Sequence, residues 1–455
     1  MEARDIAALV EARAAEYDAL ARTIWERPEP AYEEAASAAL HRERLAARGF
    51  RVAECPEMAN SFIAERGSGK PVVALMGEYD ALPGMSQACG AVREPLVAGG
   101  AGHACGHNLL GVGSLAAAEA LADAAEASGL AGTVRYYGCP AEEALGRIPL
   151  VKAGRFDDVD AALTWHPADV NTPHRYATNA NLALAFRFRG RASHAALAPS
   201  AGRSALDAVQ LMNLGLEFLR EHLEPGVLLH YVITDGGRKA NIVPETAATS
   251  LYVRAPRASG VRAAYARVLK VARGAALMTE TAFEAEASHG KCDFIPNEAI
   301  HGAMARAMAA IALPSHTAEE KAFARALAAT VDRRDRGASL AMIGAPESLL
   351  RAPIHEAVGD YGRGFRVGGS LDTGDVSYVA PTGQMNAATW PLGVGAHTWQ
   401  ACAASGSSQG AKAMRWAASV LAATGYALLS DPALLAAART EHRRARRPYR
   451  STMDL

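Results

Sequence analysis

Two residue types that bind metals lie close together in the segment Gly102-His-Ala-Cys-Gly-His-Asn108. Cys105 and His107 are two residues apart, and Gly106 between them allows a sharp bend without a Cβ clash. A thiolate and an imidazole with this spacing can point from a turn into one cavity. The N-terminus of a following helix would favour the thiolate form. The pair alone leaves two interpretations open: metal ligands, or a loop cysteine beside a helix-capping residue.

Further candidate ligands follow predicted strands or a glycine-rich loop. Glu142 and Glu143 come after a strand at 133–137, and adjacent carboxylates repel one another unless a cation lies between them. His166 ends the next predicted strand, and His397 follows a glycine-rich loop. Each of these residues could also have a purely structural role instead of binding metal. Acids are favoured in the first turn of a helix, and a lone histidine at a sheet edge usually has no special role.

Together, these side chains supply the mixed sulfur, nitrogen and oxygen donors of a divalent metal site. The predicted ligands are Cys105, His107, Glu143, His166 and His397. This set suits Zn²⁺, with Mn²⁺ as the second candidate. Five ligands exceed the three or four protein ligands of a single zinc ion, which favours two ions. Glu142 is then left as a general base for a water that the ions activate. Asp80 could orient a ligand imidazole, or be a turn residue before Pro83.

The elements that would position these residues indicate an α/β fold. Strands alternate with helices between residues 50 and 165, after helical patterns at 5–25 and 31–47. In such a sheet the carboxyl ends of parallel strands meet at one edge, where ligands bind. A long loop at 80–106 ends at the Cys105 pair, and long loops in compact domains are usually functional. A further strand is predicted at 375–380.

The pattern changes near residue 178. From there, a strand–helix–strand–strand–helix–strand order predicts a small α+β domain of ferredoxin-like order. We therefore predict a larger metal-binding α/β catalytic domain at 1–178 and 292–455, with the small domain inserted at 179–291. The basic tail 442–450 is expected to be solvated and partly frayed.

Composition limits the function classes. The 455 residues include 47 basic and 48 acidic side chains, a formal net charge of −1, so a basic field for nucleic acid is absent. No apolar run reaches the roughly 18 residues of a membrane-spanning helix, and no signal peptide is recognisable at the N-terminus. Six scattered cysteines without a CxxC pair are typical of a reducing compartment. We therefore expect a cytoplasmic protein that binds neither nucleic acid nor membrane.

Two competing motifs are weaker. Gly406-Ser-Ser408-Gln-Gly410 fits the nucleophile-elbow pattern of serine hydrolases, but no strong strand precedes it and no ordered aspartate and histidine follow it. Gly100-Ala-Gly102-His-Ala-Cys105 approaches a dinucleotide-binding fingerprint but lacks the third glycine and the preceding strand. Neither motif changes the prediction of a metal site.

Several longer segments resemble the superfamily of dinuclear metal-dependent amidohydrolases and peptidases. It includes carboxypeptidase G, the aminoacylases and the plant indoleacetyl-amino-acid hydrolases, and the branch acting on aminobenzoyl-glutamate is the most similar. The matching segments include Gly77-Glu-Tyr-Asp-Ala-Leu-Pro-Gly84, Gly102-His-Ala-Cys-Gly-His-Asn-Leu-Leu-Gly111, Tyr136-Tyr-Gly-Cys-Pro-Ala-Glu-Glu143, Trp165-His-Pro167, Gly374-Asp-Val-Ser-Tyr378 and Ala396-His-Thr-Trp-Gln400. The similarity extends over nearly the whole chain.

The resemblance implies roles for individual residues. It implies that the five ligands above bind metal and that Glu142 is general base and then general acid. It also implies that Asp80 is the carboxylate that orients groups of the metal site. It also implies that the inserted domain is a lid that dimerises and closes over the substrate. There His194 resembles a lid histidine that stabilises the oxyanion in the site of the other subunit, although it could be an ordinary loop residue. Asn241 and Arg254 match positions near the substrate carboxylate, although Arg254 could equally be a structural ion-pair partner.

The predicted metal site and the resemblance together imply a metal-dependent amidohydrolase for an N-acyl amino acid with an aromatic acyl group, such as p-aminobenzoyl-glutamate. It would use two Zn²⁺ or Mn²⁺ ions per subunit and act as a homodimer, or as a heterodimer with a related subunit. The alternatives are a dipeptidase or an indoleacetyl-amino-acid hydrolase of the same superfamily. A further alternative is a non-catalytic binding subunit.

Overall fold

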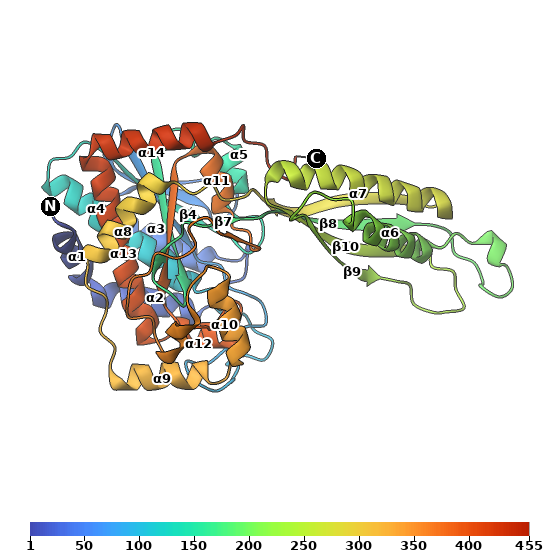
Figure 1. Cartoon of the computed structure of the whole chain (residues 1–455), viewed down its shortest axis with the longest axis horizontal. Helices are drawn as coiled ribbons and strands as arrows, with labels where there is room; N and C mark the ends of the chain where they lie inside the picture. Colours follow the sequence, from blue (N-terminus) through green and yellow to red (C-terminus); the bar gives the residue numbers. More distant parts are fainter. Residues whose placement is uncertain (455) are drawn as a thin grey trace. The chain divides into compact units, whose positions relative to one another are not determined.

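The computed structural model describes residues 1–454, which divide into two compact units (Figure 1). The larger unit comprises residues 1–177, 295–367 and 376–448. The smaller unit comprises residues 178–294 and 368–375 together with the chain from Tyr449 onward.

A seven-stranded sheet forms the centre of the larger unit, in the order β1-β2-β4-β3-β5-β13-β6. Its strands are β1 (Arg51–Glu54), β2 (Phe62–Ser68), β3 (Val72–Glu78), β4 (Gly132–Cys139), β5 (Ala161–Ala168), β6 (Thr172–Pro173) and β13 (Thr382–Ala388). The central strands β4, β3, β5 and β13 are parallel, and the outer strands are antiparallel to their neighbours. All residues of β3 and β13 are buried, as expected for strands covered on both faces.

The larger unit also contains helices, of which the one at 373–379 begins in a segment of the smaller unit. They are α1 (Ala3–Glu11), α2 (Ala14–Glu26), α3 (Ala35–Ala47), α4 (His107–Ala127), α5 (Ile148–Lys152), α8 (Glu298–Ala310), α9 (Ala318–Ala328), α10 (Arg333–Ala341), α11 (Thr373–Val379), α12 (Trp399–Ser405), α13 (Ser408–Ser430) and α14 (Pro432–Ala445). The long helices α4 and α13 lie against each other and against the sheet. No single helix in residues 1–454 is long and apolar enough to cross a membrane, and only α13 and α14 together, bent by 98°, meet that criterion.

Close packing fixes α4 over the sheet. Gly113 on α4 faces the indole ring of Trp165 on β5, where an added Cβ would lie 2.9 Å from the ring. The indole nitrogen of Trp165 donates to the carbonyl of Leu110 on the same helix, at 3.1 Å. The N-terminus of α4 is therefore held beside the carboxyl end of β5.

The smaller unit is a four-stranded antiparallel sheet with two helices. Its strands run in the order β11-β8-β10-β9, with β8 (Ala180–Arg189), β9 (Leu228–Asp235), β10 (Thr246–Ala255) and β11 (Ala282–Lys291). Alternate residues of β10 are buried, and the helices that pack on the sheet are α6 (Ala205–Arg220) and α7 (Ala258–Thr279). The α/β class and the ferredoxin-like order are confirmed.

The unit boundaries differ from those predicted. The insertion covers 178–294 rather than 179–291. The segments 368–375 and 449–454, which the sequence predicts in the larger domain, belong to the smaller unit. The buried carboxylate of Asp375 explains this, because it accepts hydrogen bonds from the backbone of Cys292 at 2.8 Å and the hydroxyl of Tyr449 at 2.9 Å. Within the tail predicted to be solvated, Arg443, Arg444, Arg446 and Arg450 are exposed. Ser451 and Thr452, just beyond it, are fully buried.

Two element predictions were wrong. Residues 375–380 lie mostly in the helix α11 rather than in a strand, and the strand that follows, β13, was missed. Its sequence Thr382-Gly-Gln-Met-Asn-Ala-Ala388 has, after Thr382, none of the β-branched and aromatic residues that usually mark a strand. Its place beside β5 is fixed by tertiary pairing and burial instead. The short remaining elements are β7 (Ala177–Thr178), β12 (Arg366–Val367), η1 (Pro199–Ala201) and η2 (Glu347–Arg351).

Candidate metal centre

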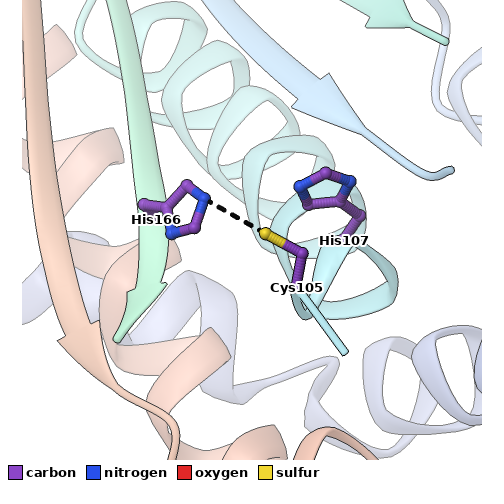
Figure 2. A group of neighbouring side chains, drawn as sticks. All are labelled: Cys105, His107 and His166. Atoms are coloured by element: carbon purple, nitrogen blue, oxygen red, sulfur yellow. Dashed lines mark hydrogen bonds between the residues drawn. The ribbon is translucent and has the colours of Figure 1, made fainter. Parts of the chain in front are cut away.

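The five predicted ligands converge at the carboxyl edge of the parallel strands. Figure 2 shows Cys105 and His107 at the start of α4 facing His166 on β5. Gly106 between the first two residues adopts a left-handed φ of 76°, and a Cβ there would lie 2.8 Å from Pro167. The turn therefore needs glycine, which explains how two neighbouring side chains reach one cavity.

The donors form two groups that share Cys105. One group is Cys105, His107 and His166, and the other is Cys105, Glu143 and His397; within each group the ligand atoms lie within 4.8 Å of one another. The sulfur of Cys105 lies 3.6 Å from Nε2 of His166. A tetrahedral zinc ion, with bonds of about 2.0–2.3 Å, holds its ligand atoms roughly 3.3–3.6 Å apart. The residues present therefore fit two divalent ions, which the two groups would hold with Cys105 available to both.

The loop that carries His397 is tied to the loop that carries Cys105. The backbone nitrogen of His397 donates to the carbonyl of Ala104 at 2.8 Å, and His397 has a left-handed φ of 62°. Its Nε2 lies 2.9 Å from Oε1 of Glu143. His397 is far from the other ligands in sequence, but this backbone hydrogen bond and its left-handed conformation bring its side chain to the same site.

Asp80 contacts two of these elements at once. Its Oδ1 lies 2.8 Å from Nδ1 of His107, and its Oδ2 accepts a hydrogen bond from the backbone nitrogen of Glu143 at 3.0 Å. If His107 donates its Nδ1 proton to Asp80, Nε2 presents a lone pair to the site. This is the arrangement that a carboxylate orienting a ligand imidazole requires.

Sequence reasoning missed Glu78, the last residue of β3. Its Oε2 lies 3.2 Å from Nε2 of His107, and neither atom has a hydrogen-bond partner within residues 1–454. Its Oε1 pairs with the fully buried guanidinium of Arg147. Two buried acceptor atoms facing each other need a proton or a cation between them. The signal was available, since Glu78 stands two residues before Asp80 at the end of a buried strand.

Glu142 lies with this third group. A ligand atom of Glu142 lies within 4.8 Å of those of Glu78 and His107, and its side chain is 5% exposed. It is placed next to the donor groups without belonging to either of the two that contain Cys105. This is the position that a general base beside a metal-activated water would occupy.

Several side chains of the metal centre have strongly shifted pKa values. Burial alone would raise the pKa of the Cys105 thiol, but His107 and His166 outweigh it and hold that pKa well below its usual range. Burial opposes charge on His166 as well, yet the Cys105 sulfur raises the pKa of His166 to about 9. Hydrogen bonding to Cys105 and Glu143 raises the pKa of His397 to about 10. A thiolate held among imidazoles is the ionic form that binds metal, and cation binding would release the imidazole protons.

The three predicted substrate residues lie in the smaller unit, whereas the five ligands belong to the larger unit. His194 and Asn241 are exposed and neighbour each other, since the backbone of Ala195 donates to the carbonyl of Asn241 at 3.0 Å. Arg254 is half-buried on β10 and donates to the hydroxyl of Ser370 at 3.2 Å. Its guanidinium carbon lies 5.4 Å from the ring centroid of Tyr252.

The serine-elbow alternative is wrong. Ser408 begins α13 directly after α12, rather than following a strand. Its hydroxyl donates to the carboxylate of Glu320 at 2.6 Å, which makes it a helix-terminal structural residue.

Comparison with known proteins assigns the chain to a family of peptidases. Residues 74–424 match peptidase family M20/M25/M40, and the chain belongs to this family. It is 41% identical to the B subunit of p-aminobenzoyl-glutamate hydrolase from Escherichia coli (strain K12), over 95% of this chain and 93% of that protein. It is 32% identical to Xaa-Arg dipeptidase of Mus musculus, over 62% of this chain and 65% of that protein. In fold it is similar to a dinuclear metal-binding M20 peptidase of Bacillus subtilis, with a TM-score of 0.59, 17% identity and coverage of 92% of this chain and 99% of that one.

These findings confirm the predicted superfamily. The chain is a metal-dependent hydrolase of amide bonds. The alternatives of a dipeptidase and of other N-acyl amino acid hydrolases lie within the same family.

Proposed function

We propose that this protein hydrolyses the amide bond between an aromatic acyl group and an amino acid, with p-aminobenzoyl-glutamate as the first candidate substrate. The observation that carries the proposal is the convergence of Cys105, His107, Glu143, His166 and His397, with Glu142 beside them. The Escherichia coli relative, whose name states this activity, supports the substrate class. The likeness to the Mus musculus dipeptidase makes a dipeptide the second candidate.

The same five residues are proposed to hold two divalent ions. Thiolate and imidazole donors favour Zn²⁺, and the carboxylate and imidazole donors also accommodate Mn²⁺. When bound, such ions polarise the amide carbonyl and lower the pKa of water. Asp80 keeps the His107 ring in the orientation that directs Nε2 into the site.

The chain's own residues would then move the protons. Glu142 accepts a proton from water as the water oxygen bonds to the amide carbon. As the carbon–nitrogen bond breaks, Glu142 returns that proton to the leaving amine. His194 of a second protomer is proposed to stabilise the oxyanion, and Asn241 and Arg254 to bind the carboxylate of the amino acid.

A homodimer formed through the smaller unit is proposed as the working assembly. Within residues 1–454, strand β9 is an edge strand that pairs only with β10, and its residues Val232 and Ile233 are 59% and 42% exposed. On the neighbouring helix α6, Phe218 is 69% exposed. An open edge beside exposed apolar side chains favours pairing with another chain.

A heterodimer with a related subunit is the alternative assembly. The Escherichia coli relative is named as one of the subunits of its enzyme, which supports a partner of the same family. We also propose a cytoplasmic location for the protein, in line with its six free cysteines.

The test is hydrolysis by protein loaded with Zn²⁺ or Mn²⁺. We expect release of p-aminobenzoate from p-aminobenzoyl-glutamate, faster than cleavage of indoleacetyl-amino acids or of dipeptides ending in arginine. Glu142→Ala should lower kcat by about 10²–10⁴-fold, the usual contribution of general acid–base catalysis, while metal content stays unchanged. Wild-type turnover in that variant would refute the role of Glu142. Failure of every N-acyl amino acid would instead favour the binding-subunit alternative.

A further inference from the structure

Two buried carboxylates hold the backbone on either side of Glu142. The backbone nitrogen of Glu143 donates to Asp80 at 3.0 Å. The backbone nitrogen of Ala141 donates to Oε1 of Glu34 at 2.8 Å. The residues on either side of the candidate base are therefore both held, through their backbone nitrogens, by side chains from elsewhere in the chain.

Glu34 is an unusual residue for its position. It is fully buried, and within residues 1–454 it forms no ion pair. Its oxygens accept hydrogen bonds from the backbone nitrogens of Tyr32, at 2.9 Å, and Ala141, and from the side-chain amide of Asn60 at 3.3 Å. A buried carboxylate is costly unless it is well hydrogen-bonded, so a purely structural role would be served better by an apolar side chain.

The turn that Glu34 holds is strained. Ala141 has a φ of 53°, in the left-handed region that costs an L-residue roughly 1–2 kcal/mol. Its carbonyl accepts hydrogen bonds from the backbone nitrogens of Ala144 at 3.0 Å and Gly146 at 2.7 Å. With the nitrogen bound to Glu34, both polar groups of Ala141 are fixed. The chain can thus reverse direction after β4 and present Glu142 and Glu143 to the site.

The segment around Glu34 also contacts the loop that carries Asp80. The backbone nitrogen of Ala81 donates to the carbonyl of Glu29 at 2.8 Å, and Pro30 and Ala81 form an isolated β-bridge. Residues 29–34 therefore join the two loops that supply Asp80 and Glu142. A shift of this segment would move both carboxylates relative to the α4 ligands.

We propose that Glu34 is a positioning residue for Glu142, acting through the backbone nitrogen of Ala141. The proposal rests on the proposed function, since it needs Glu142 to be the group that moves the proton. Glu34 itself belongs to none of the groups of candidate metal ligands. Its effect is to keep the Glu142 carboxylate within reach of the reacting water.

The experiment compares four variants as metal-loaded full-length protein. Glu34→Ala removes the acceptor, Glu34→Asp keeps the charge but withdraws the oxygen by one methylene, and Glu34→Gln keeps a carbonyl oxygen at the same reach. Glu33→Ala is the matched control, because the neighbouring Glu33 is exposed. We expect kcat to fall about 10–100-fold in Glu34→Ala, the range for a catalytic group displaced by roughly an ångström, and less in Glu34→Asp. KM and metal content should stay within about twofold, and Glu34→Gln should recover most of kcat.

A second background separates positioning from folding. If Glu34 acts through Glu142, then Glu34→Ala adds no further loss to the residual rate of Glu142→Ala. An equal loss in both backgrounds would overturn the proposal, as would an unchanged kcat per folded molecule. If Glu34→Ala does not fold, Glu34→Asp provides the same comparison. Should Glu142→Ala itself keep wild-type turnover, the proposed function fails first, whatever the Glu34 variants do.

Discussion

At the scale of single residues, Cys105 has the greatest influence on the site because it belongs to both ligand groups. Cys105→Ser replaces a soft thiolate with a hydroxyl that is a poor ligand at neutral pH. We expect the affinity for both ions to fall by at least about tenfold, the size of effect seen even for outer-shell partners of metal ligands. Competition with a chromophoric chelator measures this. Loss of only one ion would show that the sulfur is not shared.

Asp169 gives a prediction for pH dependence. Burial raises the pKa of its carboxyl to about 6, while its Oδ2 accepts from the backbone of Gly393 at 2.9 Å. A raised folded-state pKa means that the native state holds the proton more tightly than the unfolded chain. The native protein therefore loses stability as pH rises from about 4 to about 6.

Asp169→Asn keeps an acceptor for Gly393 and cannot ionise. Relative to the wild type, its free energy of unfolding should increase by about 2 kcal/mol between pH 4 and pH 7, because one pKa unit corresponds to about 1.4 kcal/mol and the unfolded carboxyl is already partly ionised at pH 4. Denaturant unfolding at the two pH values measures the difference. A constant offset between the two proteins would contradict the assignment.

At the scale of elements, a buried ionic cluster fixes α4 against α2 and α3. Glu119 on α4 is fully buried, accepts from the hydroxyl of Tyr17 at 2.8 Å and pairs with Nε of Arg44 at 2.7 Å. Removing one partner leaves buried charges uncompensated, so Glu119→Ala should lower the free energy of unfolding by about 3–5 kcal/mol. Glu126→Ala is the control on the same helix, because its exposed pair with Arg66 should contribute less than about 1 kcal/mol. Equal losses in the two variants would rule out the burial argument.

Local sequence patterns predicted part of the fold and of the metal site. The ligands were recognisable because each stands next to a strand end or a glycine turn, and the α/β alternation placed those ends at one edge. Strand β13 was missed because its buried residues carry no strand pattern of their own. Glu34 was missed because its role comes from a contact with Ala141, which is distant in sequence. The joining of residues 368–375 to the smaller unit likewise depends on the buried Asp375, not on any local pattern.

At the scale of the whole molecule, the proposed dimer depends on the open edge of β9. A charged side chain on the edge strand opposes pairing, and one on the adjoining apolar surface of α6 opposes its burial. Val232→Lys and Phe218→Lys should therefore each convert a dimer to a monomer in light scattering. Val92→Lys is the control, because Val92 is 71% exposed in the larger unit. If His194 serves a second protomer, the monomeric variants also lose kcat while keeping metal. A wild-type protein that is monomeric and fully active would contradict the dimer.

The central claim is that five side chains from separate elements hold two divalent ions. Metal analysis of the purified, Zn²⁺-loaded protein and of two single-ligand variants tests it most directly. We predict two ions per chain in the wild type. We predict one ion in His166→Ala, which affects the first ligand group, and one in His397→Ala, which affects the second. A wild-type protein that binds no metal, or two variants that both retain two ions, would contradict the claim.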